Sequence, residues 1–492
     1  MLFNSYEFIF VFLPITFFIY FYLNHKRLTI ASKGFLVFSS LFFYSWWNIA
    51  YLPLILLSML FNYLIGNSLN KDGNENKIGN KKTFSKKSIL IFGIVSNLAL
   101  LGYFKYADFF IENFNFISGV NLNLLHMFLP LAISFFTFQQ IAYLVDSYKK
   151  ETKEYDFLNY ALFVTFFPQL IAGPIVHHKE MMPQFDSAKN MVKNYRNIAL
   201  GLFIFSIGLF KKVVIADTFA VWATAGFDTA TTLNLLEAWA TSLSYTFQLY
   251  FDFSGYTDMA IGIALLFNIK LPINFNSPYK ALSIQDFWRR WHITLSRFLR
   301  DYIYIPLGGN KKGNFRTYTN LMATFILGGF WHGAGWTFLF WGFLHGLSLA
   351  IHRLWQTLGF KMWTWLAWLI TFNFVNIAWV FFRAKEWDDA LRILSSMFSL
   401  DNIVIDMKFK EKLIFLENYG IEFNRVTENL EGGSDIINFL IMSFLIVLLS
   451  KNSMEFKNNF KSDILRLLFT TFLFIYSIFY FNRFSEFLYF NF

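Results

Sequence analysis

The 492-residue sequence contains no cysteine. Disulfides, cysteine-ligated metal centres and thiol nucleophiles are therefore excluded. The sequence also lacks a P-loop, a G-x-S-x-G nucleophile elbow and a G-x-G-x-x-G dinucleotide fingerprint, so nothing points to the sites those motifs build. His177 and His178 lack carboxylates at metal-ligand spacing, and we expect no metal.

Charge is also scarce. Charged residues make up 15% of the chain and hydrophobic residues 56%, whereas a soluble protein carries about 25% charged residues. The apolar residues form long runs, each near the roughly 20 residues that cross a bilayer. The composition predicts an all-α polytopic membrane protein with roughly 11–13 membrane helices or half-helices. The clearest runs are Phe8–Leu23, Leu52–Leu69, Ile89–Tyr103, Met127–Val145, Ile198–Phe210, Met362–Phe382, Ile436–Leu449 and Leu465–Tyr480.

The net charge of +10 is distributed as membrane topology requires. Basic clusters such as Lys71–Lys87, Lys211–Lys212 and Arg289–Arg316 read as short cytoplasmic loops, which fits the positive-inside rule. The acidic segment 401–435 is expected at the outer surface, where it has room for a short amphipathic helix. Residues 436–492 are expected to form C-terminal helices and an aromatic tail. We predict one integral-membrane domain over residues 1–492, in contact with the lipid bilayer and with no nucleic-acid partner.

One histidine lies inside an apolar run. His332 stands in FILGGFWHGAGW, where several glycines allow backbones to approach closely. An imidazole is costly in hydrocarbon, so it serves either as a structural hydrogen-bonding group or as a functional one. The glycine and tryptophan frame favours function, since a neutral imidazole can accept a hydroxyl proton and return it, as acyl transfer requires.

A second polar segment precedes it. Residues 283–304 alternate aromatic and aliphatic side chains with arginines, which predicts one amphipathic helix at the cytoplasmic interface. His292 lies in this segment and is either an interfacial histidine or a partner of His332 in a common cavity. Arg289, Arg290 and Arg297 are candidates for binding the phosphates of a donor such as acetyl-coenzyme A, because guanidinium groups bind phosphate bidentately. A positive-inside anchor is the alternative role for them.

A third polar group interrupts the apolar run around YFDFSGYTD. Asp252 and Asp258 need partners in a membrane interior, and the arginines of 289–300 are the expected ones, in a structural ion pair. Two further histidines, His345 and His352, follow Trp341 on one expected helix, and one of them is a candidate for lining the cavity.

These residues resemble the membrane-bound O-acyltransferase family, in its bacterial branch that acylates cell-envelope polymers. The resemblance covers most of the chain and implies a ring of helices around a central tunnel. It maps the catalytic histidine to His332 and the second polar catalytic position to His292. The matching segments are MLFNSYEFIFVFLPI, SFFTFQQIAYLVDSY, FPQLIAGPI, YFDFSGYTDMAIGIALLF, DFWRRWHITLSRFLRDYIYIPLGGN and FWHGAGWTFLFWGFLHG.

The resemblance implies that acetyl leaves cytoplasmic acetyl-coenzyme A, crosses a bacterial inner membrane and reaches a polysaccharide through a periplasmic SGNH-type acetyltransferase partner. Peptidoglycan is the first choice of acceptor, and alginate or another exopolysaccharide is the alternative. The rival class is a transporter or flippase for a lipid-linked sugar. That class predicts internal pseudo-symmetry, and we find no internal repeat in the sequence.

The C-terminal residues FLYFNF resemble the aromatic tail of the single-span partner in teichoic-acid D-alanylation systems. By this resemblance Tyr489 is an acyl relay. The alternative is an aromatic anchor at the outer membrane interface.

Overall fold

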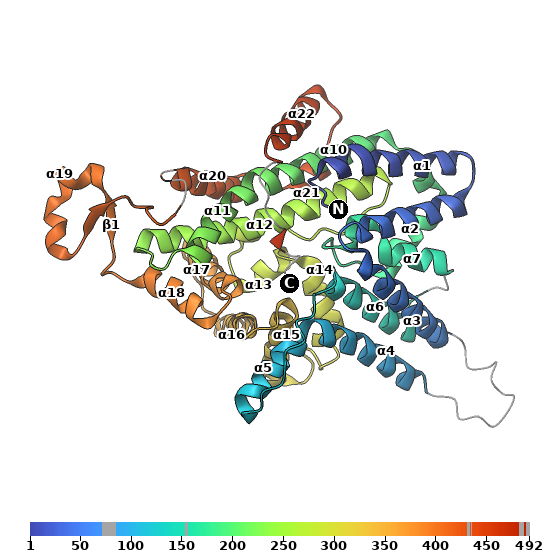
Figure 1. The fold of residues 1–492 in the computed structure, drawn as a ribbon, viewed down its shortest axis with the longest axis horizontal. Helices are drawn as coiled ribbons and strands as arrows, with labels where there is room; N and C mark the ends of the chain where they lie inside the picture. Colours follow the sequence, from blue (N-terminus) through green and yellow to red (C-terminus); the bar gives the residue numbers. More distant parts are fainter. Residues whose placement is uncertain (71–84, 153–155, 431–432, 434, 482–486, 489–492) are drawn as a thin grey trace. The chain divides into compact units, whose positions relative to one another are not determined.

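The computed structural model describes all residues except 71–84, 153–155, 431–432, 434, 482–486 and 489–492 (Figure 1). The described chain is almost entirely helical and divides into two compact units. Unit 1 comprises Met1–Ile207, Tyr256–Pro272 and Phe460–Phe472, and unit 2 comprises Gly208–Gly255, Ile273–Asn459 and Leu473–Phe492. Each is described by itself.

Unit 1 is built from apolar helices that share a phenylalanine-rich core. Helices α1 and α2 lie side by side (Figure 1), and Phe8, Phe43 and Phe167 pack ring against ring. Its elements are η1 (Glu7–Phe12), α1 (Leu13–His25), α2 (Thr29–Ser45), η2 (Ile49–Tyr51), α3 (Leu52–Asn70), α4 (Lys86–Leu101), η3 (Gly102–Tyr106), α5 (Ala107–Ser118), α6 (Ile133–Tyr148), α7 (Phe157–Thr165), α8 (Phe167–Leu170), α9 (His178–Asp186) and η4 (Ala188–Met191).

Three helices, α10 (Tyr195–Phe210), α12 (Leu235–Leu266) and α22 (Ile464–Ile478), contribute residues to both units. Unit 2 holds the histidine and arginine segments. Its other elements are η5 (Lys211–Ala216), α11 (Asp217–Thr224), η6 (Ala225–Thr229), η7 (Pro278–Lys280), α13 (Ile284–Arg290), α14 (Ile293–Leu299), η8 (Arg300–Tyr304), α15 (Gly313–His332), α16 (Trp336–Thr357), α17 (Thr364–Arg383), α18 (Trp387–Phe398), β1 (Val404–Asp406), η9 (Met407–Phe409), α19 (Lys410–Leu413), η10 (Ile414–Tyr419), β2 (Glu422–Asn424), α20 (Asp435–Leu449) and α21 (Ser453–Asn458).

The predicted polytopic membrane protein is confirmed. Five continuous helices in the described chain are long and apolar enough to cross a bilayer, and two shorter apolar helices, α20 and α22, follow. The larger helix count and the ring around a tunnel stay predictions. The five long helices are Glu7–His25, Ile49–Asn70, Lys86–Ser118, Tyr195–Thr229 and Thr364–Arg383.

Two sequence-based boundaries are wrong. The run Met127–Val145 is not one span, because regular helix begins only at Ile133, after Ala132 in a left-handed backbone conformation. The segment 283–304 is not one helix either, since α13 ends at Arg290 and α14 begins at Ile293. The cause is the chain at 274–276, whose backbone accepts from Ile293 N–H and donates to the Arg290 carbonyl, so it occupies the helix break.

The acidic segment 401–435 contains a small two-stranded sheet that the sequence did not suggest. Strands β1 and β2 pair in parallel, with Val404 opposite Glu422, and the four-residue α19 lies between them.

Candidate functional site

Helices α15 and α16 form a tightly packed hairpin whose turn carries His332. They make close contact along their length (Figure 1), because glycines face backbone on the other helix. A Cβ on Gly329 would collide with the Phe338 carbonyl oxygen, and one on Gly342 would collide with the Phe325 carbonyl oxygen. The close approach expected from the glycines around His332 is therefore present.

We expect Gly329→Ala to destabilise the protein by about 1–3 kcal/mol, the usual cost of overpacking a dense contact. Gly335→Ala is the matched control, because a Cβ there meets only the Phe338 ring and the Thr337 hydroxyl at 3.6–3.8 Å. Apparent melting temperatures of the detergent-purified variants measure the effect. Equal melting temperatures for the two variants would contradict the tight packing of this hairpin.

His332 is the last residue of α15 and lies in an aromatic cage. Its ring contacts Trp331, Trp341 and Phe382, with ring centroids 4.9–5.3 Å apart. The side chain is 4% exposed. A neutral imidazole at this position can accept a proton.

A further histidine lies across one ring from His332. The His345 ring contacts the Trp341 ring, and their centroids are 4.6 Å apart. Trp288 Nε1 donates to His345 Nδ1 at 3.2 Å, so the proton of the neutral ring is assigned to Nε2. Nε2 has no hydrogen-bond partner among the described residues. The signal that could have separated His345 from His352 is its position three residues after Gly342, at the close contact of α15 and α16.

His292 occupies the break between α13 and α14. It is fully buried and has a left-handed backbone, with φ of 42°. Asn274 Oδ1 accepts from the Thr294 N–H and lies 3.1 Å from His292 Nδ1. The oxygen must therefore accept from Nδ1–H as well, which leaves Nε2 as the basic nitrogen. The ring stands edge-on against Phe253 at 4.8 Å. An interfacial histidine at the lipid headgroups is ruled out by this burial.

A cavity of about 340 Å³ adjoins α13, α14 and α16. Its apolar wall includes Trp288, which contacts Trp341, the neighbour of His332. Its polar wall includes Arg300 and Arg353. A hydrogen bond from Arg300 to Asp301 raises the pKa of Arg300 and keeps it charged.

The α16 residues of this cavity share one face of the helix. Leu349, His352, Arg353 and Gln356 are spaced three, one and three residues apart, as one helical face requires. Arg353 Nε and His352 Nε2 have no hydrogen-bond partner among the described residues. His352 lines this cavity, but His292 and His332 do not, so the expectation that His345 or His352 lines a cavity with them stays a prediction. The contribution of Arg353 was missed.

The three predicted donor-binding arginines do not line this cavity. Arg290 binds Asp286 at 2.9 Å and the Asn276 carbonyl, Arg289 is exposed, and Arg297 is half-buried on α14. Their role toward a phosphate stays a prediction.

Asp252 has a different partner from the expected one. Its carboxylate lies 2.7 Å from the Lys212 ammonium, which lies 2.7 Å from Asp217 as well. The prediction of an arginine partner is wrong for Asp252, and so is the assignment of Lys212 to a cytoplasmic loop. The apolar run does not end at Phe210, because η5 and α11 continue the helix to Thr224. Lys212 is therefore a buried residue of this helix.

The C-terminal tail reaches this charge pair. The Leu488 N–H donates to Asp252 Oδ2 at 3.1 Å, and the buried Phe487 ring lies 6.5 Å from that of Phe253. Tyr489, the predicted relay, lies outside the described residues.

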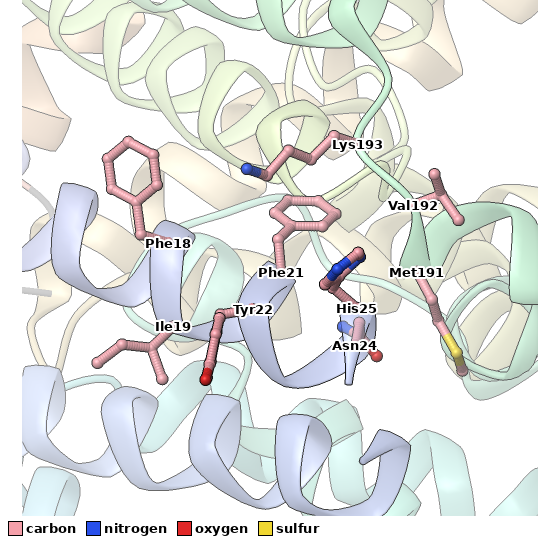
Figure 2. Close-up of a pocket in the computed structure, with 9 residues that line it drawn as sticks. All are labelled: Phe18, Ile19, Phe21, Tyr22, Asn24, His25, Met191, Val192 and Lys193. Carbon is pink, nitrogen blue, oxygen red and sulfur yellow. The ribbon is translucent and has the colours of Figure 1, made fainter. Parts of the chain in front are cut away.

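Unit 1 contains a larger cleft with fewer polar and charged side chains in its lining. It has a volume of about 720 Å³ and is lined mainly by α1 aromatics, with Lys193 placed 5.6 Å from the Phe18 ring (Figure 2). His177 and His178 are buried rather than in an exposed loop. Burial lowers the pKa of His178 to about 4 against the opposing effect of Asp146, so the ring is neutral.

Comparisons with known proteins agree with the chemistry of unit 2. The model of the membrane-bound O-acyltransferase family matches residues 146–385, which include His292, His332 and His345. The "Peptidoglycan O-acetyltransferase" of Helicobacter pylori is 50% identical, and the alignment covers 100% of this chain and 98% of that protein.

The names of more distant relatives mention other polymers. The "Probable alginate O-acetylase AlgI" of Pseudomonas aeruginosa is 42% identical over 81% of this chain and 75% of its own length. The "Teichoic acid D-alanyltransferase" of Bacillus subtilis is 27% identical over 61% of this chain and 85% of its own length.

Proposed function

Because this chain belongs to the membrane-bound O-acyltransferase family, we propose that it transfers acetyl from cytoplasmic acetyl-coenzyme A across the bacterial inner membrane for the O-acetylation of peptidoglycan. The protein is a membrane-embedded acyltransferase. The family assignment therefore excludes the alternative of a transporter that catalyses no reaction. The observation that carries the acceptor is the full-length 50% identity to the Helicobacter pylori protein, which extends through the C-terminal tail.

His332 performs the proton transfer in this proposal. As the neutral base, it takes the proton from an acceptor hydroxyl while that oxygen attacks the acetyl thioester, and it returns the proton to the leaving thiolate. His292 is the second polar group, with Nε2 as its basic atom. His345 assists from across Trp341, since its Nε2–H is a donor.

The cavity beside α16 is the donor site in this proposal. Coenzyme A combines phosphates with a slender pantetheine arm. Arg300 and Arg353 supply guanidinium groups for the phosphates. The wall formed by Trp288 separates the cavity from Trp341 and His332, and the thioester arm has to pass it to reach the base.

We expect Arg353→Gln to raise the KM for acetyl-coenzyme A by about tenfold or more, because a hydrogen bond to a charged group contributes about 1.5–3 kcal/mol. Acetyl-coenzyme A hydrolysis or transfer by purified protein measures it. Arg289→Gln is the matched variant outside the cavity. A raised KM for Arg289→Gln alone would move the phosphate site to the exposed arginine, as the sequence suggested, and overturn the cavity assignment.

Deletion of the gene in its own bacterium tests the acceptor. Base-labile acetate on purified peptidoglycan should disappear and return with the wild-type gene but not with His332→Ala. Alginate or another exopolysaccharide is the second candidate acceptor, on the 42% identity to the Pseudomonas protein. Loss of acetate from secreted polysaccharide, with peptidoglycan acetate unchanged, would select it.

A periplasmic partner completes the proposal. The acetyl group leaves on the outer side and passes to an SGNH-type acetyltransferase, whose serine nucleophile carries it to the sugar. Co-purification of such an enzyme with the membrane protein tests this step.

A further inference from the structure

Three charged side chains meet in the interior of unit 2. Lys212 and Asp217 come from one continuous helix and Asp252 comes from α12. Lys212 is 3% exposed and places its ammonium 2.7 Å from each carboxylate. One ammonium neutralises one of the two carboxylate charges, so a further donor to the second carboxylate is strongly favoured in a buried site.

The C-terminal tail supplies that donor. Asp252 turns Oδ1 toward Lys212 and Oδ2 toward the Leu488 N–H, 236 residues away in sequence. The preceding residue, Phe487, is 2% exposed and packs near Phe253.

We propose that the Lys212–Asp217–Asp252 cluster is the docking site for the chain's own C-terminal tail, with Asp252 as the positioning residue. Its carboxylate binds a backbone N–H, so it fixes the register of the tail whatever side chain follows. The buried Phe487 ring, 6.5 Å from that of Phe253, adds an apolar contact. Phe253 is also the ring that stands against His292, so docking brings the tail to the wall of the histidine site.

The functional meaning of docking rests on the proposed acyl transfer, but docking itself does not. If the tail carries acetyl outward, Asp252 sets where the carrier residue is held. If the tail carries nothing, the same contacts close the interior of unit 2. The experiment therefore measures docking and acetylation separately.

The absence of native cysteine makes the measurement clean. In a Phe487→Cys background the single thiol is buried when the tail is docked, and a maleimide reagent reports its exposure. Leu488→Pro removes the N–H that binds Asp252, whereas Leu488→Ala keeps it. Labelling of the detergent-purified protein should be about 10- to 100-fold faster with Leu488→Pro than with Leu488→Ala, given the usual strength of a hydrogen bond to a charged group.

Asp252→Asn in the same background should also accelerate labelling, because it removes the charge that strengthens the bond. Size-exclusion profiles confirm that each variant remains folded. Equal labelling rates for the proline and alanine variants would overturn the docking site. The expected labelling pattern together with normal peptidoglycan acetylation in Leu488→Pro would support docking while ending the role of the tail in transfer.

Discussion

His332→Ala should reduce acetyl transfer by about 10²–10⁴-fold while the protein inserts and folds normally, because general acid–base groups contribute on this scale. The buried imidazole stands at the end of α15, with its ring in contact with Trp331, Trp341 and Phe382. Transfer of radiolabelled acetyl by purified protein gives the rate, and size-exclusion chromatography checks the fold.

His25→Ala is the control for removing an imidazole, because His25 is an exposed residue of the unit 1 cleft. It should retain normal transfer. Near-normal activity of His332→Ala would end its assignment as the base. His345→Ala would then be the next variant to measure, since His345 is buried on the same aromatic network.

Much of the fold follows from the sequence because the relevant signals are local. Apolar runs such as Leu52–Leu69 needed no partner to be recognised as spans, and the structure has a helix over Ile49–Asn70. The glycines near His332 also indicated a close backbone contact correctly. A glycine in a membrane helix lets the backbone of a neighbouring helix approach closely, because it has no Cβ.

The parts that could not be predicted depend on contacts between distant segments. Lys212 looked like a loop lysine because its partner Asp252 lies 40 residues away on α12. The break at His292 is caused by Asn274 and its neighbours, which no periodicity within 283–304 reveals. Arg353 was overlooked for a similar reason, since its cavity is formed jointly with α13 and α14.

In the proposed relay, the contacts of Phe487 and Leu488 tie the carrier segment to unit 2, which also holds His292 and His332. The Phe253 ring lies 6.5 Å from the ring of Phe487 and 4.8 Å from that of His292, so the Phe487–Leu488 contact and the histidine share this neighbour. A carrier on the same chain requires no diffusion of an acetylated intermediate, which would otherwise be lost to water.

Tyr489→Phe should abolish acetylation of the polysaccharide while leaving the protein stable. The substitution keeps the aromatic ring and removes only the hydroxyl that the relay requires. A phenol has a pKa of about 10 and is a weak nucleophile alone, so it needs a base, and His332 is the candidate. The acetylated phenol is an aryl ester, reactive enough to pass its acyl group to the serine of a periplasmic partner.

Tyr480→Phe is the matched control, because it also removes a single tyrosine hydroxyl, which bonds to the Tyr476 hydroxyl at 3.0 Å. Base-labile acetate on peptidoglycan reports the full pathway, and mass spectrometry of the C-terminal peptide detects acetyl on Tyr489 directly. Acetylation should vanish with Tyr489→Phe and persist with Tyr480→Phe. Unchanged acetate in Tyr489→Phe would reduce the tail to an anchor held by Asp252, and the acetyl group would then have to pass from acetyl-coenzyme A to the external acceptor without a relay.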